Sequence, residues 1–122
     1  MAISDLFKNN FETRDVTQDP RLRCHYYGND YQTCQNAISS AMSGIGYKVM
    51  GVNEKYLEML FESKKAQAII TLTKVSLYET RVDIKLNTHY LIPLGRGLKH
   101  IEEIYANIDR RLTLKYKGGK GE

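Results

Sequence analysis

The chain has 122 residues, of which 42% are hydrophobic and 26% are charged, and its formal net charge is +4. This length fits one domain with an ordinary hydrophobic core, and the mild charge argues against a dedicated nucleic-acid binder, which would carry a denser basic stripe. The first residues lack the features of a signal peptide, and no apolar run approaches the ~20 residues that span a bilayer. We therefore expect a cytoplasmic protein that does not enter a membrane.

Three segments are predicted along the chain. Residues 1–20 read as a polar N-terminal arm, 21–114 as a single α+β domain, and 115–122 as a disordered basic tail. The arm contains Phe7 and Phe11. We expect these two aromatic side chains to dock either on the domain itself or on a partner.

The domain is predicted to begin with a strand over residues 22–27 and a helix from about Tyr31 to Ser43. The helix is indicated by side chains that recur every three or four positions, which are Tyr31, Cys34, Ile38, Ala41 and Ile45. Alternation along the strand separates two faces. The face predicted to be buried carries Leu22, Cys24 and Tyr26. The face predicted to be open carries Arg23, His25 and Tyr27.

A β-rich block follows this helix, with strands predicted at 47–52, 56–62, 66–74 and from 77 to about 92. The clearest signal is the strict alternation from Glu79 to Tyr90, because only a half-buried strand keeps a period of two. The side chains predicted to face the core are Val82, Ile84 and Leu86. The side chains predicted to face solvent are Arg81, Asp83 and Lys85. Short links between the strands favour an antiparallel meander.

A second helix is predicted from about 97 to 112, and its apolar stripe consists of Leu98, Ile101, Tyr105, Ile108 and Leu112. The resulting element order is β-α-β-β-β-β-α. We therefore predict an α+β fold, in which two amphipathic helices cover one face of a five-stranded antiparallel sheet and the other face meets solvent.

This element order, over residues 22–112, resembles the repeat unit of the TATA-box-binding-protein fold and, more loosely, the helix-grip folds. The chain is also similar in general look to small bacterial domains of unknown function. The resemblance concerns the order of elements and involves no motif. It therefore implies a fold and transfers no functional residue to this chain.

The solvent-facing side of the sheet is the main candidate binding surface. Its predicted members are Arg23, His25, Tyr27, Tyr56, Glu58, Leu60, Glu62, Arg81, Asp83 and Lys85. The carboxylates would repel phosphates and so disfavour nucleic acid, whereas aromatic side chains and a leucine among charges suit a protein partner or a second copy. The residues predicted to form this interface are Phe7, Phe11, Tyr27, Tyr56, Leu60 and Arg81. A purely solvated face with weak ion pairs is the alternative.

Specific chemistry has little support in the sequence. Cys24 and Cys34 fall on apolar stripes, where a thiol is buried and inert. His25, His89 and His100 are not expected to converge, so we predict no metal site and no cofactor. No nucleophile, base and orienting group can be placed together, which argues against an enzyme.

One candidate anion site remains. The segment of Gly95, Arg96 and Gly97 precedes the second helix, and free backbone amides there could hold a phosphate or carboxylate. The alternative is that these glycines only let the chain turn after Pro93.

We therefore expect a small cytoplasmic interaction module without catalytic activity, which self-associates through an edge strand or the open face, or binds another protein. Two alternatives stay open. The protein could bind a small ligand in a cavity lined by Met42, Met59, Phe61 and Ile104. It could also bind nucleic acid weakly through its basic C-terminal end.

Overall fold

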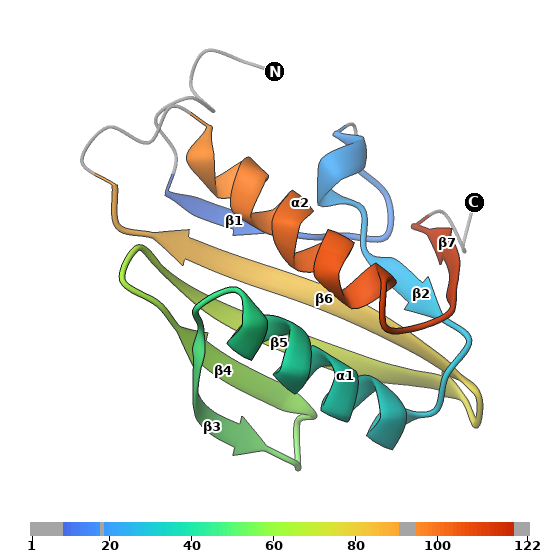
Figure 1. The fold of residues 1–122 in the computed structure, drawn as a ribbon. Helices are drawn as coiled ribbons and strands as arrows, with labels where there is room; N and C mark the ends of the chain where they lie inside the picture. The colour runs from blue at the N-terminus through green and yellow to red at the C-terminus, as the bar shows by residue number, and fades with distance from the viewer. Residues whose placement is uncertain (1–8, 18, 91–94, 119–122) are drawn as a thin grey trace.

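The computed structural model describes residues 9–17, 19–90 and 95–118 (Figure 1). The elements in chain order are β1 (Asn10–Glu12), the short 3-10 helix η2 (Pro20–Leu22), β2 (His25–Tyr27), α1 (Tyr31–Gly44), β3 (Lys48–Asn53), β4 (Glu58–Glu62), β5 (Ala66–Ser76), β6 (Glu79–Thr88), α2 (Arg96–Asp109) and β7 (Leu114–Lys117). Within these described residues, no helix has the length and apolar composition needed to cross a membrane.

The strands form one seven-stranded sheet with the order β3-β4-β5-β6-β2-β7, in which every strand pair is antiparallel. β1 pairs with β6 as well, and β1 and β2 follow one another along the same edge of β6 (Figure 1). The predicted α+β class is confirmed, but the prediction of five strands is wrong. The two additional strands are β1, in the predicted arm, and β7, in the predicted tail.

The reason for this error is the length of the two strands. β1 has three residues and β7 has four, so neither contains enough alternation to be recognised as a strand. The prediction of a disordered tail is wrong for Lys115–Lys117, which belong to β7. With these strands at both ends of the chain, the likeness to the TATA-box-binding-protein order is not confirmed.

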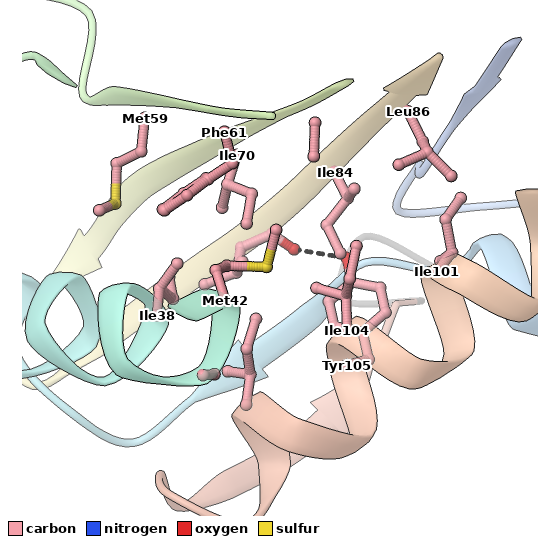
Figure 2. Packing of buried hydrophobic residues seen from close by; sticks show 14 of the residues in the cluster. Ile38, Met42, Met59, Phe61, Ile70, Ile84, Leu86, Ile101, Ile104 and Tyr105 are labelled. Atoms are coloured by element: carbon pink, nitrogen blue, oxygen red, sulfur yellow. Dashed lines mark hydrogen bonds between the residues drawn. The ribbon is translucent and has the colours of Figure 1, made fainter. Parts of the chain in front are cut away.

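Both helices lie on the same face of the sheet, and the hydrophobic core fills the layer between them and the strands (Figure 1). The alternation of β6 is confirmed, because Val82, Ile84 and Leu86 face the helices and are at most 1% exposed. Figure 2 shows Ile84 and Leu86 directed toward Ile104 and Ile101 of α2. The apolar stripe of each helix therefore meets the apolar face of the sheet, as its periodicity predicts.

The two faces of β2 are assigned the wrong way round by the sequence. His25 pairs with Val82 of β6 and therefore shares its core-facing side, and Tyr27 lies in the core. Tyr26 points to the opposite side of the sheet. Because both faces of this strand carry a tyrosine, its composition does not identify the buried one, and a shift of one residue exchanges them.

The predicted arm is part of the fold from Asn9 onward. Phe11 pairs with Leu86 of β6 and lies in the core at 6% exposure. Its ring occupies the space beside Gly97 at the start of α2. Phe11 therefore docks on its own domain, which is one of the two alternatives that the sequence left open.

Candidate functional site

β3 is the largest continuous stretch of exposed strand in the described part of the chain. All six of its residues are exposed, and they include Val49 (56%), Met50 (56%) and Val52 (44%). β3 pairs with β4 on one side only, at the end of the strand order. Its outer side thus presents backbone N–H and C=O groups together with apolar side chains, the combination that another strand can bind.

The apolar character continues on both sides of this edge strand. Val49 and Val52 pair with Phe61 and Met59 of β4, so they share the helix-covered side of the sheet. On the opposite side, Leu60 borders a shallow hollow of about 330 Å³. The residues that line this hollow are Gly51, Val52, Asn53, Glu58, Leu60 and Ile69. A strand added to β3 would therefore find apolar groups beside it on both faces.

The other end of the sheet is built differently. β7 has only four residues, and two of them are the lysines Lys115 and Lys117. Short length and lysine side chains are two common ways in which proteins prevent an edge strand from pairing. The two ends of the strand order are thus unequal, since β3 is the longer strand and exposes apolar side chains.

Two of the residues predicted to form an interface lie beside β3. Tyr56 is exposed in the turn between β3 and β4, with the Lys55 ammonium 5.4 Å from the centre of its ring. Leu60 is exposed on β4. Arg81 lies on β6, away from this edge, and its Nε donates to Asp83 at 2.7 Å.

Two other predicted interface residues do not contribute to an exposed surface. Phe11 and Tyr27 are buried in the core, so neither side chain is available to a partner in this fold. Phe7 lies outside the described residues. Sequence reasoning misassigned Tyr27 because it depended on the inverted faces of β2.

The two cysteines are buried, as the sequence predicts. Burial raises the pKa of the Cys24 thiol to about 12 and also raises the pKa of Cys34. Because the thiolate is the reactive form of cysteine, neither side chain is a nucleophile near neutral pH.

The three histidines lie in separate environments. His25 Nδ1 donates to Asp109, and His100 Nε2 lies 2.6 Å from the Tyr90 hydroxyl. Burial lowers the pKa of His100. In the part of the chain that the structure describes, no three metal-ligating side chains gather in one place.

The predicted ligand cavity in the layer between sheet and helices is filled. Met42, Met59, Phe61 and Ile104 are at most 1% exposed and belong to the core cluster. Figure 2 shows Met42, Phe61 and Ile104 directed into this same layer. None of these four side chains lines the hollow beside β3, the hollow lined by Asn10 and Lys85 or the hollow at His25.

The segment predicted to bind an anion is engaged in packing. Gly95 has the left-handed φ of 77° at the N-cap of α2, where glycine is favoured. The Arg96 guanidinium lies 4.8 Å from the centre of the Tyr90 ring. A Cβ on Gly97 would lie 2.3 Å from the Phe11 ring. Anion binding at these residues stays a prediction.

We expect Gly97→Ala to lower the free energy of unfolding by about 1–3 kcal/mol, the usual range for an overpacked core. The helix propensity of alanine favours this substitution by about 1 kcal/mol, but the 2.3 Å approach to Phe11 is too close to be accommodated without a shift. Urea denaturation measures the difference. In the background of Phe11→Leu, which shortens the opposing side chain, the same substitution should cost much less. An equal cost in both backgrounds would contradict the steric explanation.

The structure also brings together polar residues that the sequence leaves apart. The Tyr27 hydroxyl donates to Asp109 Oδ1 at 2.6 Å, and His25 Nδ1 lies 2.9 Å from the same oxygen. Asp109 ends α2, whereas the other two belong to β2. The available signal was the position of Asp109 four residues after Tyr105, which puts both on one side of the helix.

Comparison with known proteins adds no assignment, since neither a protein-family model nor a curated protein matches this chain.

Proposed function

We propose that this protein is a small interaction module that binds a second copy of itself through β3. The observation that carries the proposal is the exposed apolar edge of Lys48–Asn53. Addition of a strand to such an edge satisfies its free backbone groups, and the side chains beside it supply apolar contact.

The sequence of β3 suits antiparallel pairing with itself. In a two-fold arrangement that places Met50 opposite Gly51 of the second copy, Val49 lies opposite Val52. The same register brings Lys48 of one copy close to Asn53 and Glu54 of the other. Apolar residues then meet at the centre, and opposite charges meet at both ends, which favours this register.

The difference between the two sheet edges favours a closed dimer. Pairing of β3 with β7 of another copy would be head to tail and could continue into a filament. Lys117 disfavours that contact, since a partner strand would have to accommodate its charge, whereas the Lys115 ammonium is paired with Glu79 at 2.9 Å.

The variant Val52→Lys is expected to weaken the dimer about thirtyfold. Two-fold symmetry introduces two lysines per dimer, and a loss of about 1 kcal/mol of apolar burial at each corresponds to that factor. Sedimentation velocity over a concentration series measures the dissociation constant.

Val75→Lys is the matched control, because Val75 is an exposed valine (38%) on β5, remote from β3. It should dimerise like the unmodified protein, and both variants should keep the circular dichroism spectrum of the fold. A protein that remains monomeric at hundreds of micromolar, or a dimer insensitive to Val52→Lys, would reject the proposal.

A further inference from the structure

A second hollow, distant from β3, lies where α2 meets β2, β7 and η2. Its volume is about 340 Å³, which is the lower end of the range for ligand sites. The lining residues are Pro20, Arg21, His25, Glu102, Tyr105, Ala106, Asp109 and Lys117. Four chain segments thus contribute a mixture of apolar walls and titratable groups to one small space.

The imidazole of His25 is held in a fixed orientation at this hollow. Its side chain is 7% exposed and stacks on Tyr105, with ring centres 3.6 Å apart and an angle of 8° between the planes. Nδ1 donates to Asp109 Oδ1, which also accepts from the Tyr27 hydroxyl. Because three neighbouring side chains define its position, the ring needs no rearrangement to act on a ligand.

The second ring nitrogen of His25 remains available. Nε2 makes no hydrogen bond with the described residues. It is also absent from the set of fully buried side-chain nitrogen and oxygen atoms that have no hydrogen-bond partner. Since a fully buried Nε2 would belong to that group, this nitrogen keeps some exposure to solvent, and His25 is one of the residues that line the hollow. A nitrogen whose partner ring atom bonds a carboxylate is well placed to take up a proton and donate it to an anion.

We propose that this hollow binds a small oxyanion between Nε2 of protonated His25 and the ammonium of Lys117. Lys117 has no ion pair within the described residues, whereas Arg21 is already bonded to Asp19 at 2.9 Å. The chemical group recognised is a sulfate-, phosphate- or carboxylate-sized anion. The volume admits such a group with a small substituent.

The charges around the imidazole explain why binding is coupled to protonation. α2 contributes Asp109, Glu102 and the Tyr105 hydroxyl; β2 contributes Tyr27; η2 contributes Arg21; and β7 contributes Lys117. Arg21 is bonded to Asp19, and its Nε lies 3.7 Å from Glu102, so its charge is already balanced. With neutral His25, Arg21 and Lys117 face three carboxylates, those of Asp19, Glu102 and Asp109. The imidazolium adds a third cation and removes this excess of negative charge, which favours an anion beside Lys117.

The test is an NMR titration with sodium sulfate at constant ionic strength, with chloride as the replacement salt, that follows the ring signals of His25. Sulfate keeps its charge between about pH 6 and pH 8, so any pH dependence arises from the protein. We expect the signals to shift with saturation, and the affinity to be weaker at pH 8 than at pH 6, because binding takes up one proton.

Three exposed positions provide variants that leave the buried network intact. Lys117→Gln should weaken sulfate binding about tenfold, and Glu102→Gln, which removes a carboxylate from the hollow, should strengthen it. Lys64→Gln removes an exposed lysine from the turn between β4 and β5 and should bind like the unmodified protein. Equal affinities for the Lys117 and Lys64 variants, affinity independent of pH, or no saturable shift would overturn the proposal. None of these results depends on β3 or on the oligomeric state.

Discussion

Phe11→Ala is expected to lower the free energy of unfolding by about 3–5 kcal/mol, the range for removal of a buried phenylalanine. Phe11 is 6% exposed, pairs with Leu86 of β6 and packs against Gly97 of α2. Its removal would leave a cavity between the sheet and the second helix. Since small domains are stable by about 5–15 kcal/mol, this single change would remove a large part of the total.

Urea denaturation monitored by circular dichroism measures this loss. Tyr78→Ala is the matched control, because Tyr78 is an aromatic residue of the same chain at 69% exposure, and its removal should change stability by no more than about 0.5 kcal/mol. If Phe11 instead belonged to a free arm that binds a partner, both variants would unfold at the same urea concentration as the unmodified protein. That outcome would show that β1 is not an integral strand.

Asp109→Ala is expected to cost about 2–4 kcal/mol at neutral pH. The substitution leaves two buried donors without their acceptor, the Tyr27 hydroxyl and His25 Nδ1, and each costs about 1–3 kcal/mol. Asp109→Asn should cost less, because its amide oxygen can still accept one of the two hydrogen bonds. Glu103→Ala, at an exposed position of the same helix, should be nearly neutral.

The cost of removing Asp109 should depend on pH in a defined direction. Burial of Asp109 favours the neutral acid, but hydrogen bonds from His25 and Tyr27 outweigh it and lower the pKa below the ordinary value of 3.8. The unfolded chain therefore binds this proton more readily than the folded one, so the carboxylate stabilises the fold above about pH 3.8. That contribution is lost as the pH falls through the lower, folded-state pKa.

Thermal unfolding from neutral to acidic pH tests this dependence. The melting temperatures of the unmodified protein and of Asp109→Ala should differ most near neutral pH and converge below about pH 3.8. A difference that stays constant across this range would mean that Asp109 stabilises the fold by packing, with no contribution from its charge.

The two proposed binding surfaces are only partly accessible to sequence reasoning. Tyr56 and Leu60 were recognised as candidates, and both lie beside β3. The exposure of β3 itself was not recognised, because an edge position depends on the order of strands in the sheet, and that order is not encoded in any local pattern. The hollow at His25 was missed for a related reason, since it joins side chains 84 residues apart in the chain.

The elements that the sequence by itself determined are the long ones. Two helices with apolar stripes and the alternating strand β6 each repeat a burial pattern over ten or more residues, and burial of apolar surface is the dominant favourable term in folding. Only the tertiary structure decided where β1, β2 and β7 pair in the sheet and which of their faces are buried. These strands have three or four residues, so they form because longer neighbours offer backbone partners, and their buried faces follow from that pairing.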